Sequence, residues 1–479
     1  MGGDNIKRLK DFWDCNLDIV IESIEEDSRI KAPNSLFCCL KGSTHDGHNH
    51  VQEAIQNGAV AIMASKNLIT SVPVLKVRDV NKGMVQALSR FYDKVDEKLK
   101  LIGVTGTDGK TSVASMLYQL INKVDSCGYL GTNGVKCHNY EKKMDFTTPF
   151  PKDLFYYLSI FDEAGCRYVA MEVSSERLQS KRLNQLKYDV AIFTNLTMEH
   201  LNTHKTMTNY VRAKGELFKQ LKQTGYAIIN NDDLYAPEIK KMATGKVITY
   251  GIKNKADVLA TDIVIKENYL SFHLKLFNQD YDIESPLSGL FNVYNLMAVI
   301  TACAVSGLDI KVVVKNIKTL MPIKARLEFI NYNQPFKIVL DYAHTPNALK
   351  NLLDYLRLIA KGRIITVTGS AGGRDKGKRP ITGQVVTSLS DYVIFTMDDP
   401  RFEEVDDIIN EMVSQLDKKI NNYERIVDRG TAIHQALSMA KVDDIVVIAG
   451  RGHDKYIPIK GKDIPYSDAA EIKKFFKMQ

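Results

Sequence analysis

The segment that most constrains the fold of this chain, residues 101–112, reads Leu-Ile-Gly-Val-Thr-Gly-Thr-Asp-Gly-Lys-Thr-Ser. It predicts a hydrophobic strand, a glycine-rich turn and a helix that opens with Lys110. Such a turn directs several backbone N–H groups and the positive end of a helix dipole at one point. Lys110 adds a positive charge for nucleotide phosphates, and Thr111 offers a hydroxyl suited to Mg²⁺. We predict that a nucleoside triphosphate binds to Gly106, Thr107, Asp108, Gly109, Lys110, Thr111 and Ser112.

The segment departs from the general phosphate-loop pattern G-x-x-x-x-G-K-[ST] at one position. Val104 stands where the first glycine of the pattern belongs, and Gly103, Gly106 and Gly109 follow at intervals of three. This spacing indicates a tighter variant of the loop. A strand-to-helix turn without a ligand is the alternative, but it leaves the Lys-Thr-Ser run after a glycine unexplained.

Length and composition narrow the class of protein. The chain has 479 residues, too many for one hydrophobic core, and its 44% apolar and 25% charged residues are ordinary for a soluble globular protein. The net charge of +7 is spread thinly and suits small anionic substrates, so no nucleic-acid partner is expected. The seven cysteines include no C-x₂-C pair, which indicates free thiols in a reducing cytosol.

The chain carries no sequence signal for secretion or for membrane insertion. Residues 1–16 are polar and charged, unlike a signal peptide. No apolar run approaches the roughly 18–20 residues that a membrane span needs. We therefore expect a cytoplasmic protein without a membrane span, and a monomer.

Short apolar strands alternate with helices along the chain and predict an α/β fold with mostly parallel sheets. We expect strands at residues 35–40, 59–64, 167–173, 190–195, 227–230, 337–341, 364–368, 392–396 and 444–449. Three domains are predicted: an N-terminal α/β domain over residues 1–98, a central P-loop ATPase-like domain over 99–325 and a C-terminal Rossmann-like α/β domain over 326–479. Ligands of such sheets gather at the carboxyl ends of the strands, where most polar motifs fall.

A second group of polar residues lies in the same strand series as the phosphate loop. Glu172 ends one expected strand, and its carboxylate beside the loop suits Mg²⁺. His200 follows the next strand and by itself is more often a hydrogen-bonded structural residue. Lys214, in an expected helix over residues 210–218, would by itself be a solvated lysine. Spacing alone does not establish a second metal site.

Several motifs occur in one order along the chain and carry a resemblance to a known family. They are residues 26–29, 106–112, 147–149, 171–175, 194–200, 341–346, 372–380, 398–401 and 450–454. Together they resemble the Mur ligases, ATP-dependent enzymes that build the peptide stem of bacterial peptidoglycan. Within that family the chain is similar to the UDP-N-acetylmuramoyl-tripeptide synthetases, which add the third residue. The resemblance spans essentially the whole chain.

The resemblance implies a reaction and a set of cofactors. A diamino acid would be joined to UDP-N-acetylmuramoyl-L-alanyl-D-glutamate through an acyl phosphate, with release of ADP and phosphate. The implied cofactors are ATP, Mg²⁺ at two sites and a carbamate on Lys214. Lys110, Glu172, His200 and Lys214 would be catalytic, with Thr111, Glu172, His200 and carbamylated Lys214 as metal ligands.

The family's binding residues carry over to matching positions. Contacts to the UDP part fall on Ser28, Asp46, Gly47 and His48, and contacts to the sugar-peptide fall on Thr147, Thr148, Ser175 and Arg182. The family's Gln before that arginine is replaced by Ser180, with Gln179 one position early. Contacts to ATP fall on Asn292, Asn295, Arg326, Asp341 and His344.

The incoming amino acid would be held by the C-terminal domain. The matching positions are Arg374, Asp398, Asp399, Pro400, Arg401, Gly450 and Asp454. Arg401 fits the distal carboxylate of meso-diaminopimelate, because guanidinium pairs bidentately with carboxylate. Diaminopimelate enzymes usually carry Asn at the position of Asp399 and Glu at that of Asp454, and an anion at Asp399 would favour the ammonium of L-lysine. Both amino acids stay open, as does a surface ion pair of Arg401 with Glu403 or Glu404.

Two other functions are compatible with the nucleotide loop. A related ligase with another substrate, such as a folylpolyglutamate synthetase, would not need the Thr-Thr-Pro and Asp-Ser-Arg motifs. A nucleotide-binding regulator without catalytic activity would not need Lys110, Glu172, His200, Lys214 and Arg326 together. ATP turnover that depends on a UDP-muramoyl dipeptide and an amino acid would distinguish the three.

Overall fold

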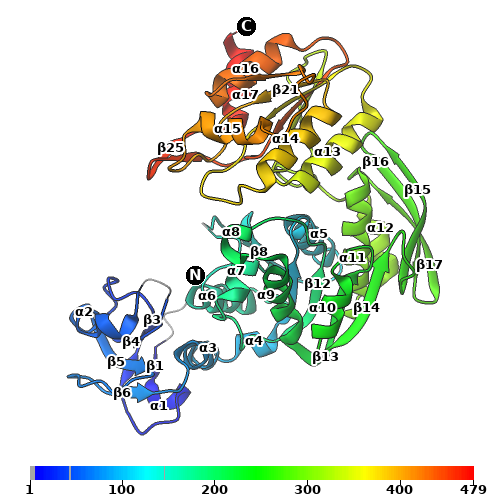
Figure 1. The fold of residues 1–479 in the computed structure, drawn as a ribbon. Helices are drawn as coiled ribbons and strands as arrows, with labels where there is room; N and C mark the ends of the chain where they lie inside the picture. Colours follow the sequence, from blue (N-terminus) through cyan, green and yellow to red (C-terminus); the bar gives the residue numbers. More distant parts are fainter. Residues whose placement is uncertain (1–5, 43–44, 145, 479) are drawn as a thin grey trace.

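The computed structural model describes residues 6–42, 45–144 and 146–478. Residues 1–5 of the polar opening segment, and Gln479, lie outside the described residues. Figure 1 shows three α/β bodies in chain order, with the central body between the other two. This confirms the predicted fold class, whereas the boundaries after residues 98 and 325 stay predictions. No helix in the described part of the chain is long and apolar enough to cross a membrane.

The N-terminal body is built on a four-stranded parallel sheet of order β3-β4-β5-β6. Its strands are β3 (Ser23–Glu25), β4 (Ser35–Cys38), β5 (Ala59–Ala64) and β6 (Val74–Lys76). Its helices α2 (Val51–Gln56) and α3 (Val80–Phe91) follow β4 and β6. A short ribbon of β1 (Lys7–Arg8) and β2 (Val20–Ile21) precedes the sheet.

The central body contains an eleven-stranded sheet of order β10-β9-β8-β11-β7-β12-β13-β14-β15-β16-β17. Its parallel part comprises β8 (Cys127–Gly131), β11 (Tyr168–Glu172), β7 (Lys100–Thr105), β12 (Tyr188–Phe193), β13 (Leu221–Asn230) and β14 (Lys246–Gly251), and β14 also pairs in parallel with the start of β15. Strand β7 lies between β11 and β12, and both of its faces are buried: Leu101 belongs to one apolar core, and Ile102 and Val104 belong to another. The turn after β7 is therefore held by the most enclosed part of the sheet.

Helices cover both faces of this sheet. They include α5 (Lys110–Ile121), α6 (Pro151–Glu163), α7 (Ser175–Gln179), α8 (Leu201–His204), α9 (Met207–Lys219), α10 (Ala236–Met242), α11 (Leu290–Val305) and α12 (Ile310–Ile317). Short α4 (Val95–Lys98) leads into β7, and α1 (Leu9–Phe12) lies in the N-terminal body. The helix expected over residues 210–218 is α9, which begins three residues earlier because Thr206 caps it.

Both edges of the central sheet continue as antiparallel hairpins that the sequence did not predict. They are β9 (Gly134–Cys137) with β10 (Tyr140–Lys142), and β15 (Val258–Lys266) with β16 (Tyr269–Leu276) and β17 (Gln279–Ser285). Figure 1 shows β15–β17 as a long ribbon that reaches the C-terminal body. There Ile265 packs against the C-terminal core, and Lys337 pairs with Glu267 at 2.6 Å.

The C-terminal body has a six-stranded sheet of order β18-β19-β23-β20-β21-β22, parallel except for β18. The strands are β18 (Glu328–Ile330), β19 (Lys337–Asp341), β23 (Ile445–Ala449), β20 (Ile364–Thr368), β21 (Tyr392–Phe395) and β22 (Tyr423–Arg425), followed by a ribbon of β24 (Tyr456–Ile459) and β25 (Lys462–Pro465). Helices α13 (Pro346–Ile359), α14 (Lys378–Leu389) and α15 (Val405–Val413) share one core with the sheet, and α16 (Arg429–Met439) and α17 (Asp468–Met478) share another.

The predicted strands agree with the structure closely where the apolar run is fully buried. Residues 59–64, 337–341 and 364–368 form β5, β19 and β20 with the predicted bounds. The largest difference is at β13, which begins at Leu221 rather than at residue 227. Its first half carries Lys222, Gln223 and Thr224, which are not fully buried, so this half lacks the apolar pattern of a core strand.

Candidate nucleotide and ligase site

The turn between β7 and α5 lies against the end of β12. Gly106 approaches it so closely that a Cβ atom there would lie 1.8 Å from the Thr194 hydroxyl oxygen. Gly109 has φ of +86°, which favours glycine. The Thr194 hydroxyl donates to the carbonyl of Asp108 at 2.6 Å, and the Asp108 N–H donates to the side chain of Asn195 at 2.9 Å. The loop is thus fixed in shape without a ligand.

Lys110 is held over this loop without an anionic hydrogen-bond partner. Its ammonium donates to the carbonyls of Gly106 at 3.0 Å and Thr107 at 2.9 Å. Burial lowers the pKa of Lys110, although Glu172 and Asp108 act in the opposite direction. A partly desolvated ammonium with only neutral partners is suited to a phosphate group.

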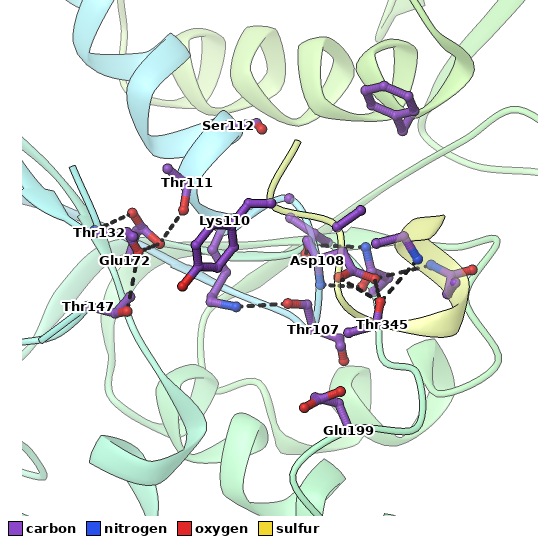
Figure 2. Close-up of a pocket in the computed structure, with 18 of the residues that line it drawn as sticks. Thr107, Asp108, Lys110, Thr111, Ser112, Thr132, Thr147, Glu172, Glu199 and Thr345 are labelled. Carbon is purple, nitrogen blue, oxygen red and sulfur yellow. Dashed lines mark hydrogen bonds between the residues drawn. The ribbon is translucent and has the colours of Figure 1, made fainter. Parts of the chain in front are cut away.

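Thr111 and Glu172 form a candidate Mg²⁺ site beside the loop. The Thr111 hydroxyl donates to the Glu172 carboxylate at 2.8 Å. The same carboxylate accepts from the Tyr129 hydroxyl at 2.8 Å and from the Thr132 N–H at 2.8 Å. Figure 2 shows Thr111, Thr132 and Glu172 on one side of the cavity, with Lys110 beside them. An oriented carboxylate and a hydroxyl are the oxygen donors that Mg²⁺ prefers next to phosphates, so these residues fit the ion.

A cavity of about 770 Å³ brings together most residues that the sequence motifs predicted. It lies between the phosphate loop, the ends of β11 and β12, and the start of the C-terminal body. The predicted residues that line it are Thr107, Asp108, Gly109, Lys110, Thr111, Ser112, Thr147, Thr148, Glu172, Ser175, His200, Lys214, Asn292, Asn295, Arg326, Asp341, His344 and Arg374. Gly106 forms the floor of the loop through its carbonyl.

Lys214 is buried at the back of this cavity. Its exposed fraction is 1%, its ammonium donates to the carbonyl of Gly106 at 2.6 Å, and it lies 4.6 Å from the centre of the Tyr210 ring. Burial and the nearby Lys110 hold the pKa of Lys214 well below its usual value. The structure therefore places Lys214 in the interior, unlike the solvated lysine that the helical pattern alone indicates.

His200 lines the cavity, but its nearest acid is Glu176 and not Glu172. Its Nδ1 atom lies 3.6 Å from the carboxylate of Glu176, and its backbone adopts a φ of +57° at the start of α8. Among the described residues, no group of three or more His, Cys, Asp or Glu side chains could hold a metal ion. A second metal site at Glu172 and His200 would therefore need an additional ligand, and a modified Lys214 would supply one.

The C-terminal body docks directly onto the phosphate loop. The Thr345 hydroxyl and the Asn347 amide donate to the Asp108 carboxylate, each at 3.2 Å. Figure 2 shows Asp108 and Thr345 facing each other on the side of the cavity opposite Glu172. Arg326 donates to the Thr111 hydroxyl at 3.4 Å. Residues 108–111 of the loop are therefore in contact with Arg326 and with residues 345–347 of the C-terminal body.

A buried ion pair joins the two bodies below the loop. Lys378 donates to the carboxylate of Glu199 at 2.8 and 3.1 Å, and both side chains are almost inaccessible to solvent. Lys378 also donates to the carbonyl of His344 at 3.2 Å. Glu199 and Lys378 lie in the motifs 194–200 and 372–380, but neither has a predicted role, because nothing in their spacing links them.

The side of the cavity next to α11 suits a nucleobase. The Asn292 amide donates to the carbonyl of Ser288 at 2.7 Å, and the Asn295 amide donates to the Asn292 side chain at 3.1 Å. The side chains of Phe291 and Tyr294 line the same wall and were not predicted. The Tyr294 hydroxyl is anchored by the Asp232 carboxylate at 2.9 Å, which leaves its ring as a rigid surface.

Asp341 ends β19 in the C-terminal body, and His344 follows it three residues later. Asp341 accepts from the N–H groups of Leu327 at 2.5 Å and Ala343 at 2.7 Å. Burial raises the pKa of Asp341, against the effect of the nearby Arg326 guanidinium. His344 Nδ1 lies 2.9 Å from the carbonyl of Tyr342. These contacts fix the segment that carries Thr345.

The predicted UDP-binding residues lie in the N-terminal body and do not line this cavity. The Ser28 hydroxyl donates to Glu53 at 2.5 Å, and Asp46 contacts His48 Nδ1 at 2.5 Å and the Lys66 ammonium at 2.7 Å. Gly47 lies against the backbone of residues 39 and 40, where a Cβ atom would make tight contacts of 3.0 Å. Ser28 follows β3, and residues 46–48 follow β4, at the carboxyl ends of that sheet.

The predicted amino-acid residues other than Arg374 form a neighbouring cluster, outside the cavity lining. Arg401 has a φ of +55°, and its N–H donates to the carbonyl of Pro458 at 2.9 Å. The alternative ion pairs of Arg401 are not formed, because Glu403 pairs with Arg379 and Glu404 with Lys460. Burial and the adjacent Arg374 lower the pKa of Arg401. Its guanidinium is available for a carboxylate.

Arg451, which lies in the motif 450–454 but has no predicted role there, neutralises the acids of this cluster. Its guanidinium, 1% exposed, contacts the Asp399 carboxylate and lies 3.4 Å from that of Asp398. A Cβ atom on Gly450 would lie 2.9 Å from Asp398. Asp454 accepts from the Tyr342 hydroxyl at 3.4 Å, and burial raises its pKa to about 6.

The site and the fold define an enzyme of three α/β bodies that uses a nucleoside triphosphate, and the comparisons identify its family. Residues 104–303 match the Mur ligase middle domain, residues 325–452 the Mur ligase glutamate ligase domain, and residues 20–96 the Mur ligase family catalytic domain. The chain belongs to the Mur ligase family, and it is an ATP-dependent ligase.

Full-length relatives agree with this placement. The UDP-N-acetylmuramoyl-L-alanyl-D-glutamate–2,6-diaminopimelate ligase of Halalkalibacterium halodurans is 39% identical over 97% of this chain and 96% of its own length. The enzyme of that name from Geobacillus thermodenitrificans is 38% identical over 97% of each chain. A solved structure of a ligase with the same name has a TM-score of 0.70 at 29% identity and covers 99% of both chains.

The buried His204 makes the stability of the central body depend on pH. Its exposed fraction is 1%, its Nε2 atom lies 2.9 Å from the Ser175 hydroxyl, and its ring stacks on Tyr210. Burial lowers the pKa of His204 to about 4 from 6.5. Because the unfolded chain binds this proton more readily, stability is present above pH of about 6.5 and is lost as pH falls toward about 4.

We expect the substitution His204→Gln to reduce this pH dependence. Between about pH 7.5 and about pH 5 the wild-type chain should lose about 2 kcal/mol more unfolding free energy than the variant. Urea unfolding at both pH values measures the difference. Equal losses in the two proteins would show that His204 is protonated without cost in the folded state.

Proposed function

We propose that this ligase acts in the cytoplasm, as a monomer, in the synthesis of peptidoglycan precursors. Its reaction joins a diamino acid to UDP-N-acetylmuramoyl-L-alanyl-D-glutamate at the expense of ATP, and so serves cell-wall biogenesis, cell shape and division. The observation that carries the proposal is the cavity, where a preformed phosphate loop meets the C-terminal body. The full-length relatives named for this activity support the choice of substrates.

The charges of the cavity account for the chemistry. A peptide carboxylate attacks the γ-phosphoryl group of ATP, and both groups are negative. Lys110 reduces this repulsion, because its ammonium has only carbonyl partners before the nucleotide binds. Mg²⁺ held by Thr111 and Glu172 would add positive charge at the same place. An amine then displaces phosphate from the acyl phosphate, and the docked C-terminal body keeps water out.

Lys214 is suited to carbamylation because its burial lowers the pKa of its amine and so raises the share of the neutral form. The neutral form is the nucleophile that adds to carbon dioxide, and the product is an anionic oxygen donor at a place where a cation was unfavourable. Carbamylated Lys214, Glu172 and His200 would together hold the second Mg²⁺. The contact of Lys214 with Gly106 places this group directly below the loop.

Meso-diaminopimelate fits the C-terminal cluster better than L-lysine. Asp399 would repel the distal carboxylate if it were free, but Arg451 neutralises it. Arg374 lies close enough to lower the pKa of Arg401, so the pair offers positive charge for two carboxylates. Asp454, next to the Tyr342 hydroxyl, offers a polar end for an ammonium. The N-terminal residues Ser28, Asp46, Gly47 and His48 are assigned to the UDP part.

Phosphate release from ATP tests the reaction. With Mg²⁺ and the UDP-muramoyl dipeptide, we expect turnover when meso-diaminopimelate is added and at least about tenfold lower kcat/KM with L-lysine. Lys110→Met is the matched inactive control. Turnover only with L-lysine would contradict the amino-acid assignment, and no turnover with either would contradict the proposed substrates.

The Lys214→Ala substitution tests the carbamate. We expect kcat to fall by about 100-fold or more and to recover in part with acetate or formate, which can occupy the vacated position as oxygen ligands. Lys219→Ala, on the same helix but exposed and paired with Glu216, is the control and should change little. Full activity of Lys214→Ala would exclude a role for a modified lysine.

The Arg451→Gln substitution tests how Asp399 is neutralised. It should raise the KM for meso-diaminopimelate by about 10- to 50-fold, because an uncompensated carboxylate then faces the distal carboxylate. The double variant Arg451→Gln/Asp399→Asn should recover most of this loss. An unchanged KM in Arg451→Gln, or no recovery in the double variant, would show that Arg451 has only a structural role.

A further inference from the structure

Arg177 lies on the cavity wall and has no role in the proposal above. It belongs to α7, directly after the carboxyl end of β11. Its guanidinium donates twice to the carbonyl of Thr148, at 3.1 and 3.3 Å, and stacks on the ring of Phe150 with 3.7 Å to the ring centre. These contacts fix its orientation and leave further N–H donors free.

The positive charge of Arg177 is only partly balanced, by acids such as Glu26 and Glu176 that do not bind it directly. Among the described residues, no carboxylate lies within ion-pair distance of its guanidinium. Two acids nearby are engaged elsewhere: Glu26 binds Arg182 at 3.0 Å, and Glu176 lies between His200 and Arg374 at 3.6 and 3.5 Å. Burial and the neighbouring Arg182 lower the pKa of Arg177 to about 10. An anion in the cavity would relieve both effects.

The hydrogen bonds around Arg177 connect it to the reacting end of the cavity. The Thr148 hydroxyl donates to the carbonyl of Glu172 at 2.9 Å, and the Glu172 carboxylate accepts from Thr111. In Figure 2, Thr147 and Glu172 lie on the same side, opposite Asp108 and Thr345. An anion at Arg177 would therefore belong to the wall of Thr147 and Thr148, away from the nucleobase side.

We infer that Arg177 binds the carboxylate of the acid substrate that does not react, and thereby presents the other carboxylate to the nucleotide. This inference rests on the proposed function, in which the substrate ends in D-glutamate with two carboxylates of similar reactivity. A ligase must choose between them, and a fixed guanidinium on one wall makes the choice by geometry. Arg182, which the motifs assigned to the substrate, is already paired with Glu26.

Substrate analogues and the substitution Arg177→Met test the inference together. Two analogues are made, each with one of the two D-glutamate carboxylates replaced by an amide. Only the analogue that keeps the reacting carboxylate can still be ligated, so this analogue lacks the non-reacting carboxylate. We expect this analogue to lower the wild-type kcat/KM by about 10- to 100-fold. Arg177→Met should show a similar loss with the natural substrate and no further loss with the analogue, while its KM for ATP stays unchanged.

Additional variants separate binding from folding. Arg177→Lys keeps the charge without the planar fork and should recover part of the activity. Arg425→Gln, an exposed arginine of β22 that contacts Asn410, is the matched control and should behave as the wild type. Thermal unfolding of each variant checks that the fold is intact, and the Lys variant keeps the test valid if Arg177→Met is unstable.

Three results would overturn the inference. If Arg177→Met and the amidation each lower kcat/KM and their effects add up when combined, Arg177 does not contact that carboxylate. A raised KM for ATP, or weaker competition by UDP alone, would show that the anion at Arg177 is a phosphate. A wild-type enzyme that is inactive with the unmodified substrate would remove the proposed function as well, which distinguishes the two failures.

Discussion

The close approach of the phosphate loop to the end of β12 is the constraint on which the site depends. Gly106 leaves no room for a side chain against Thr194, and Thr194 and Asn195 hold Asp108 by direct hydrogen bonds. The loop is therefore shaped by the sheet and not by the nucleotide. Its carbonyl at Gly106 then receives both Lys110 and Lys214. Two buried ammonium groups that share one neutral acceptor repel each other. This repulsion favours the binding of an anion beside one lysine and the loss of a proton from the other.

Much of the fold could be predicted because fully buried strands have a local signal. The apolar runs of β5, β19 and β20 identify them without reference to their neighbours. The hairpins β15–β17 lack such runs because one face of each strand is exposed, and their position depends on contact with the C-terminal body. The phosphate loop was recognisable for a similar reason, since its glycines and its lysine are consecutive in sequence.

The rest of the site could not be predicted from spacing, because it consists of pairings between distant segments. Asp399 reads as a free anion in the sequence, yet Arg451 covers it. Arg182 matches a motif, yet Glu26 occupies it, and Arg177 faces the cavity in its place. The pairing of Glu199 with Lys378 crosses 179 positions. In each case the role of a charged residue in the site is decided by the partner that the fold places beside it, and the sequence does not show that partner.

The positions of the cations without ion-pair partners indicate where anionic substrates bind in the cavity. Three of the acids that line it accept hydrogen bonds: Glu172 from hydroxyl and N–H donors, Glu199 from Lys378, and Asp108 from Thr345 and Asn347. Within the described part of the chain, Lys110 and Arg177 donate hydrogen bonds to carbonyl oxygens and form no ion pair. A buried cation without a counter-charge is unfavourable. In the free enzyme these cations therefore favour the binding of anionic substrates at their own positions. In the proposed reaction, the phosphates at Lys110 and the non-reacting carboxylate at Arg177 supply these counter-charges, which leaves the other carboxylate of the substrate to meet the nucleotide.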